Sequence, residues 1–215
     1  MAAANLWVMG EETLAEGRRR FFADSGFAPD GGYDDSWAHA EFGPLPYSVP
    51  NLRMRAEALR VHDLHHPLTG YPADWRGEAQ ISAWELGSGG AAGYPYAWFI
   101  ALFGLLTGLL GAPQATWQAF LSGRSTRNLY GERDPMRWLA HPVEEVRREL
   151  RVTENRSPRR RDGLLFLGWS VLATALAMIF ALGSPLLVFA ALLRRLPNLG
   201  LCRLCCPVQT SGLAT

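Results

Sequence analysis

The chain has 215 residues and a formal net charge of +1, and 48% of its residues are hydrophobic and 11% aromatic. This composition excludes a disordered polar protein, and the near-zero charge argues against nucleic-acid binding, for which a strongly basic surface is usual. All 21 basic residues are arginines, which excludes a Walker-type phosphate loop, a pyridoxal Schiff base and a lysine nucleophile. The cysteines are Cys202, Cys205 and Cys206, so the body of the chain cannot form a disulfide framework, and a reducing compartment is expected.

Residues 1–50 are expected to form an N-terminal helix followed by an ordered loop. A weak amphipathic pattern extends to about Phe22. Proline and glycine then recur between residues 24 and 51 and predict irregular structure. Aromatic residues in this segment, including Tyr33 and Trp37, favour an ordered loop that is held against a core.

Two helices are predicted next, on either side of a turn. The first covers residues 52–66, follows an asparagine cap at Asn51, and is expected to end at Pro67. The second follows an N-cap at Asp74 and covers residues 75–86. A glycine-rich run comes directly after this helix, and we interpret it as a flexible helix end, because a dinucleotide-binding loop would open a helix.

An uninterrupted apolar segment covers residues 94–111. As a helix it would be about 27 Å long, which is marginal for a bilayer core of about 30 Å. A buried central helix, one wall of a lipid pocket and a membrane segment are all open interpretations. In each of them Gly104 and Gly108 form a small-residue face that permits close helix contact.

Further helices are predicted at residues 114–120, from Asp134 onward, and at residues 142–150. They complete a helical domain at residues 51–152. The predicted fold class is therefore all-α, with a C-terminal transmembrane segment.

The C-terminal part predicts a membrane anchor. A basic linker at residues 153–162 precedes an apolar segment at residues 163–195, which is long enough to cross a bilayer. Residues 183–185, Gly-Ser-Pro, divide this segment, so a kinked single span and a re-entrant pair are both open. Because arginines flank both ends, the positive-inside rule gives only a small preference for the preceding domain on the cytoplasmic side. Residues 196–215 are expected to be a disordered tail.

Ligand-capable side chains are densest at residues 62–78. His62, Asp63 and His66 share one side of the first predicted helix, and Glu78 can face them from the second. Two imidazoles and two carboxylates suit zinc, and also iron, cobalt or manganese, better than a thiolate-seeking ion. This pattern predicts a site for one divalent metal ion.

Other interpretations of this group are open. The histidines can belong to a polar helix end at the surface. The spacing of His62 and His66 also occurs in zinc peptidases, but Asp63 stands where those enzymes have a glutamate and is shorter by one methylene. His65 lies beside the motif and has no role assigned by the spacing.

The four residues also resemble a family motif. His62-Asp63, two residues, His66, eleven residues and Glu78 is similar to the signature of the coenzyme Q (ubiquinone) biosynthesis protein four family. The chain looks like a bacterial member, and the resemblance covers residues 50 to 151. It implies a mostly α-helical fold with a hydrophobic cavity for a polyprenyl or other long-chain lipid.

The resemblance also implies a function. His62, Asp63, His66 and Glu78 would bind one divalent ion, in the first place zinc, and would be the catalytic residues that act on the head group of a polyprenylated benzoate. The activity would be that of a metal-dependent 4-hydroxy-3-methoxy-5-polyprenylbenzoate decarboxylase, a lyase. The alternative is a non-catalytic lipid-binding scaffold for a membrane biosynthetic complex, for ubiquinone or another lipid.

The expected location is the cytoplasmic (inner) membrane, with the metal domain on the cytoplasmic side. Expected partners are the membrane, other quinone-biosynthesis proteins and further copies of the chain. A nucleic-acid partner is not expected.

Overall fold

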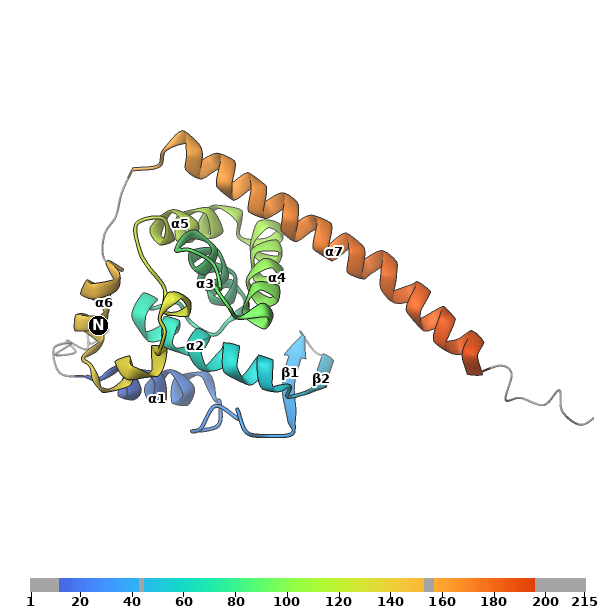
Figure 1. Cartoon of the computed structure of the whole chain (residues 1–215), viewed down its shortest axis with the longest axis horizontal. Coiled ribbons are helices and arrows are strands. Elements are labelled where there is room, and N and C mark those ends of the chain that lie inside the picture. Colours follow the sequence, from blue (N-terminus) through green and yellow to red (C-terminus); the bar gives the residue numbers. More distant parts are fainter. Residues whose placement is uncertain (1–11, 43–44, 153–156, 196–215) are drawn as a thin grey trace, which may run out of the picture. The chain divides into compact units, whose positions relative to one another are not determined.

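The computed structural model describes residues 12–42, 45–152 and 157–195, and these residues are mostly helical (Figure 1). The α-helices and strands are α1 (Leu14–Ser25), β1 (Trp37–Phe42), β2 (Leu45–Pro50), α2 (Arg53–Thr69), α3 (Trp75–Gly87), α4 (Pro95–Gly111), α5 (Pro113–Gly123), α6 (Val143–Leu150) and α7 (Arg160–Arg195). Two short 3₁₀ helices, η1 (Leu129–Gly131) and η2 (Pro135–Ala140), lie between α5 and α6. The all-α prediction is therefore confirmed in its main feature, a mostly helical chain.

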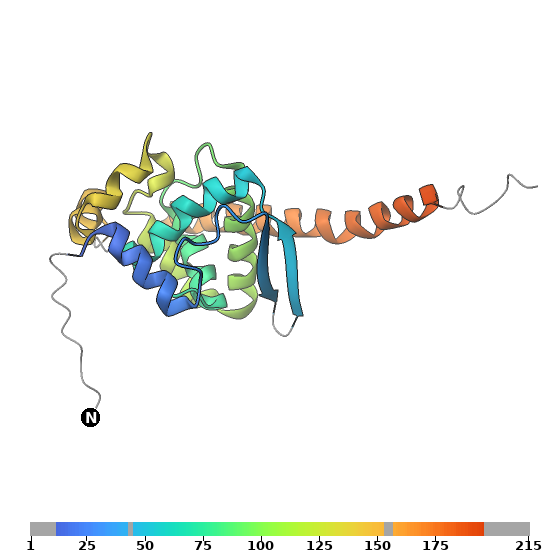
Figure 2. The ribbon, with the colours of Figure 1, turned by 90° about the horizontal axis from the view of Figure 1, so that it is seen from below.

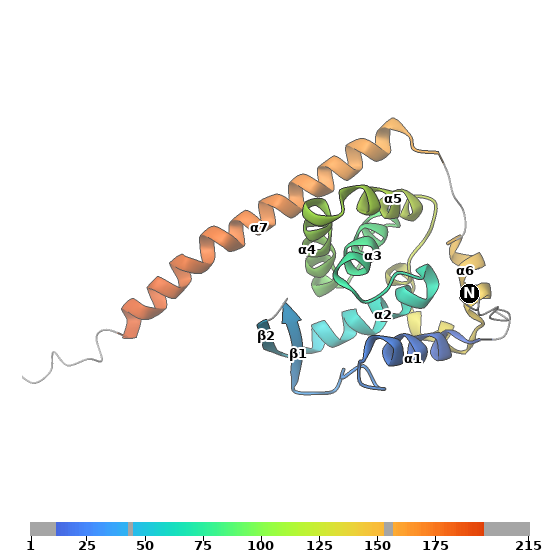
Figure 3. The same cartoon turned by 180° about the vertical axis from the view of Figure 1, so that it is seen from behind.

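The N-terminal helix α1 begins at Leu14. Thr13 caps α1 in a capping box with Glu16, and Gly26 ends the helix in the left-handed conformation at φ 71°. α1 lies beside α2, as Figure 3 shows from behind. Leu14 is fully buried in the main core, so this helix is part of the packed structure.

A β-hairpin occupies part of the segment that was expected to be a loop. β1 and β2 pair antiparallel, from Trp37 opposite Pro50 to Phe42 opposite Leu45 (Figure 2). The prolines of this segment had favoured irregular structure over strands. In a two-stranded hairpin, however, both strands are edges, where a residue without an N–H is tolerated.

Helix α2 continues past Pro67, and this corrects the predicted end at that residue. Its C-cap is Gly70 at φ 78°, whose N–H donates to the carbonyl of His66 at 2.7 Å. Thr69 Oγ1 also donates to the carbonyl of His65 at 2.8 Å. These two hydrogen bonds close the last turn, although proline supplies no N–H to the helix ladder.

Asn51 is not the cap of α2, because Leu52 occupies that position and makes no side-chain cap hydrogen bond. The amide nitrogen of Asn51 instead donates to three backbone carbonyl oxygens, those of Gly32, Tyr33 and Asp35, at 2.9–3.0 Å. This side chain therefore fixes the loop before β1 against the start of α2.

By contrast, Asp74 caps α3 as predicted and accepts the N–H of Gly77 at 2.7 Å.

Helices α3, α4 and α5 pack closely on one another (Figure 1). The small-residue face of α4 makes this possible. A Cβ atom added at Gly104 would lie 2.0 Å from Ser82 Oγ, and one at Gly108 would lie 2.4 Å from Thr116 Oγ1. The close helix contact expected at these two glycines is therefore present.

The apolar helix α4 is buried on one side only. Ala97, Ala101 and Leu105 are in the core, whereas Phe103 and Leu110 are 51% and 80% exposed. α4 contributes no residue to the cavity of about 550 Å³ between α1 and the α2–α3 turn, or to one of about 170 Å³ beside the glycine-rich turn. These cavities do not provide the lipid cavity wall expected at residues 94–111.

The crossing of α3 and α5 gives a testable prediction about stability. A Cβ atom at Gly87 would lie 2.4 Å from the backbone oxygen of Phe120, so the Gly87→Ala variant must move one helix. We expect a loss of about 1–3 kcal/mol in the free energy of unfolding, as for other overpacked cores. Gly93→Ala is the control, because an added Cβ meets nothing within 4 Å. Denaturant unfolding in detergent measures both, and equal stabilities of the two variants would contradict the close crossing.

Helix α7 has the length and composition of a membrane span over residues 160–183. Its apolar residues there are largely exposed, among them Leu164, Val171 and Ile179. The helix is continuous through residues 183–185, so the structure has one helix and not a re-entrant pair. The chain divides within α7 into two compact units, residues 1–174 and 175–215. The tail at residues 196–215, with the three cysteines, lies outside the described residues.

Candidate metal centre

The four predicted site residues come from the facing turns of α2 and α3. His62, Asp63 and His66 each offer a ligand atom, and these atoms lie within 4.8 Å of one another. Glu78, in the first turn of α3, places Oε2 3.2 Å from His62 Nε2 and Oε1 3.5 Å from His66 Nε2. The turn between the helices thus returns Glu78 to the histidines, as the sequence predicted.

His62 lies between two carboxylates. Its Nδ1 is 2.9 Å from Glu85 Oε1, on the side opposite the Nε2 contact with Glu78. Burial alone would lower the pKa of His62, but the charge of Glu85 and the hydrogen bonds to both glutamates raise it well above its usual value. In the metal-free chain the imidazole therefore carries a proton on each nitrogen.

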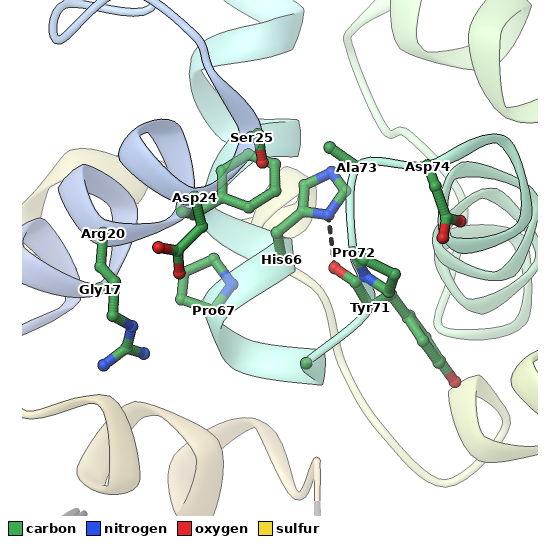
Figure 4. A pocket seen from close by; sticks show the side chains of 12 residues that line it. Gly17, Arg20, Asp24, Ser25, His66, Pro67, Tyr71, Pro72, Ala73 and Asp74 are labelled. Atoms are coloured by element: carbon green, nitrogen blue, oxygen red, sulfur yellow. Dashed lines mark hydrogen bonds between the residues drawn. The ribbon is translucent and has the colours of Figure 1, made fainter.

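His66 presents a free nitrogen to the same point. Its Nδ1–H donates to the carbonyl of Tyr71 at 2.8 Å, which leaves Nε2 unprotonated (Figure 4). Burial, together with the positive charge of His62, lowers the pKa of His66 to about 4. The ring of Phe21 stacks on the imidazole, with 4.1 Å between ring centroids. His66 is therefore held in one orientation as a neutral electron-pair donor.

The donor set fits a divalent cation. His66 Nε2 is buried without a hydrogen-bond partner, and the nearest carboxylate oxygen, on Glu78, is likewise an electron-pair donor. Two such atoms repel unless a positive charge lies between them. The proton on His62 Nε2 neutralises part of the negative charge of Glu78. A metal ion that displaced this proton would be attracted by the same carboxylate.

Asp63 is oriented by a residue from the N-terminal segment. The hydroxyl of Tyr33 donates to Asp63 Oδ2 at 2.6 Å. Burial raises the pKa of Asp63 to about 6, against the effects of His62 and of this hydrogen bond, which lower it. Tyr33 is buried, and Arg60 lies over its ring with 4.8 Å between the guanidinium carbon and the ring centroid.

The candidate metal centre is exposed to solvent at Glu78. Its side chain is 41% exposed, whereas those of His62 and His66 are 5% and 1% exposed. A ligand from solution therefore reaches the group past Glu78. The cavity of about 550 Å³ lies on another side, where His66, Pro67, Tyr71 and Pro72 form part of its wall (Figure 4).

His65, which the motif left without a role, is not directed at the candidate metal centre. Its Nδ1 lies 2.7 Å from Glu85 Oε1, and its Nε2 accepts the backbone N–H of Leu129 at 3.1 Å. Both ring nitrogens are thus occupied inside the core, where the rings of Trp84 and Tyr130 flank the imidazole at 5.2 and 5.0 Å. His65 is therefore a structural residue next to the candidate metal centre, not one of its ligands.

Sequence reasoning gave Glu85 no role. The sequence places Glu85 seven residues after Glu78, on the same flank of α3, and this spacing was the available signal. Tyr33 and the carbonyl of Tyr71 could not be found in this way, because only the fold brings them to the histidines. His141, by contrast, lies at the surface, with Nδ1 3.1 Å from Glu145 Oε1.

Comparison of the chain with protein-family models, with curated proteins and with solved structures found no match.

Proposed function

We propose that the chain is a metal-dependent protein of ubiquinone biosynthesis that acts on the aromatic head group of a polyprenylated lipid at a membrane. The observation that carries the proposal is the convergence of His62, Asp63, His66 and Glu78, at the spacing of the coenzyme Q biosynthesis protein four signature, around a neutral, unpartnered imidazole nitrogen. The long apolar helix α7 supports a membrane location.

The residues of the candidate metal centre have different roles. His62, Asp63, His66 and Glu78 would hold the divalent ion, with zinc first among the ions that suit this donor set. Such an ion supplies Lewis-acid polarisation of a carboxylate or phenolic oxygen. Phe21 shields one face of His66, while the exposed side of Glu78 leaves the centre open to a head group.

The reaction class follows from the resemblance. It is the removal or replacement of the C1 carboxyl group of a polyprenylated benzoate, and C1 decarboxylation would make the chain a lyase. The cytoplasmic membrane is the proposed location, with the metal domain on its cytoplasmic side. Quinone-biosynthesis proteins and further copies of the chain are the proposed partners.

A non-catalytic scaffold is the second candidate. It is favoured by one observation: the centre already has internal ion pairs, since His62 lies within 3.2 Å of two glutamates, Glu78 and Glu85. A cluster that is balanced in this way can stabilise the fold without a reaction. In this case the chain would present a lipid, which need not be ubiquinone, to other enzymes.

The test uses the intact chain purified from a membrane fraction in detergent. We expect a divalent metal, measured by elemental analysis at close to one ion per chain, and a co-purified polyprenylated aromatic lipid, identified by mass spectrometry. The His66→Ala and Glu78→Ala variants should lose the metal and keep the helical circular dichroism of the parent. His141→Ala, an exposed histidine, is the matched control. A chain that retains no metal in its folded state would refute the metal-dependent proposal, and a different class of lipid would refute the ubiquinone assignment.

A further inference from the structure

One buried carboxylate oxygen holds two histidines of α2. Glu85 is fully buried on α3, and its Oε1 atom lies 2.9 Å from His62 Nδ1 and 2.7 Å from His65 Nδ1. A carboxylate accepts hydrogen bonds and donates none, so each of these imidazole nitrogens carries its proton toward Glu85. The same atom therefore holds the Nδ1 proton of both rings.

The start of η1 secures this arrangement from the other side. The N–H of Leu129 donates to His65 Nε2 at 3.1 Å, and the side-chain amide of Asn128 donates to the backbone oxygen of Glu85 at 3.2 Å. Two consecutive residues thus fix His65 and the turn of α3 that carries Glu85. Neither ring nitrogen of His65 is available for another partner.

The consequence for His62 is directional. With Nδ1 held by Glu85, Nε2 is turned toward Glu78 and His66, where the candidate metal centre lies. In histidine ligands of metal ions, a hydrogen bond from the second nitrogen to a carboxylate fixes the ring and makes the ligating nitrogen more basic.

We propose that Glu85 is a positioning residue of the metal centre, which sets the orientation and donor strength of His62, and that His65 locks Glu85 in place without binding the metal. This inference rests on the proposed metal site. It assigns distinct roles to the adjacent histidines His65 and His66: His66 is a ligand, and His65 acts through Glu85.

The first experiment measures Co²⁺ affinity of the full chain in detergent by competition with a chelating dye. Glu85→Gln keeps an acceptor oxygen for both imidazoles but removes the charge, and we expect about tenfold weaker binding. Glu85→Ala removes both, and we expect a loss approaching 100-fold, the upper part of the range for such partners of metal-binding histidines. Glu57→Gln, at an exposed glutamate of α2, should bind as the parent does.

A pair of variants at His65 separates positioning from packing. Asparagine can place its amide nitrogen where Nδ1 stands and donate to Glu85, whereas glutamine can place its oxygen where Nε2 stands and accept from Leu129. We expect His65→Asn to retain most of the Co²⁺ affinity and His65→Gln to lose about tenfold. The visible absorption spectrum of bound Co²⁺ should change in the Glu85 variants, because the ligand field of His62 changes.

The outcomes are distinguishable. If the parent chain binds no Co²⁺, the proposed metal site itself fails. If the parent binds and Glu85→Gln, folded by circular dichroism, binds with the same affinity and spectrum, Glu85 is only structural and the inference is overturned. Equal affinities of His65→Asn and His65→Gln would overturn the role of His65. Because Glu85→Gln preserves the hydrogen bonds, it decides the question even if Glu85→Ala does not fold.

Discussion

Replacement of His66 by alanine, or of Glu78 by glutamine, should reduce ubiquinone formation by at least about 100-fold in a strain that depends on this chain. Both side chains belong to the candidate metal centre, and Lewis-acid stabilisation worth several kcal/mol corresponds to a factor of at least that size. Quinone content per chain, measured by lipid mass spectrometry and immunoblotting, is the readout. The accumulating lipid should retain the carboxyl group of the benzoate ring.

The same experiment separates an enzyme from a scaffold. His141→Ala changes a histidine that is exposed and paired with Glu145, and it should support quinone formation at the parental level. If His66→Ala and Glu78→Gln are present at normal amounts in the membrane and restore quinone formation fully, the catalytic proposal fails. The scaffold, with a structural polar cluster, then becomes the function to pursue.

The metal-free chain should show two opposing pH effects on stability. The pKa of His66 is lowered to about 4 from 6.5, so its contribution to stability is present above pH 6.5 and is lost as the pH falls through 4. The pKa of Asp63 is raised to about 6 from 3.8, so its contribution is present below pH 3.8 and is lost as the pH rises through 6. The two effects act in opposite directions, and that of His65, whose pKa is also lowered by burial, adds to that of His66.

Single variants should reveal each effect. Between pH 4.5 and 6, and relative to the parent, Asp63→Asn should gain about 2 kcal/mol of unfolding free energy as the pH rises, and His66→Gln should lose about as much, from about 1.4 kcal/mol per pH unit for one proton. His62, His65, Glu78 and Glu85 also have shifted pKa values, and their contributions to the slope are common to the parent and both variants. Guanidinium unfolding of chelator-treated protein measures the slopes. Identical slopes in the two variants would contradict the assigned charges.

Local patterns in the sequence predicted most of the helices. Asp74 is an N-cap that acts through its nearest neighbours, and the apolar spacing of α6 is likewise local, so both could be read from short windows. The hairpin at β1 and β2 could not, because its stability depends on pairing across a turn. The end of α2 was misplaced because the hydrogen bond from Gly70 closes a turn that proline alone would disfavour.

Part of the candidate metal centre could be predicted because it, too, depends on local patterns in the sequence. Helical periodicity places His62 and His66 together, and the cap at Asp74 fixes where Glu78 begins its helix. The partners that determine the protonation states of these ligands come from distant segments. Tyr33 lies 30 residues before Asp63, and Leu129 lies 64 residues after His65. Such contacts leave no periodic trace in a single sequence.

The three hydrogen bonds of Asn51 to the loop before β1 bear on how this protein can be divided or recombined. They hold Tyr33 where it reaches Asp63, and α1 supplies Phe21, which covers His66. A chain that began at residue 51 would keep all four candidate ligands but lose the groups that orient and shield two of them. The four-residue motif therefore depends on the N-terminal segment. If only the helix pair α2 and α3 is expressed or grafted into another protein, it should bind metal more weakly and less selectively than the full chain does.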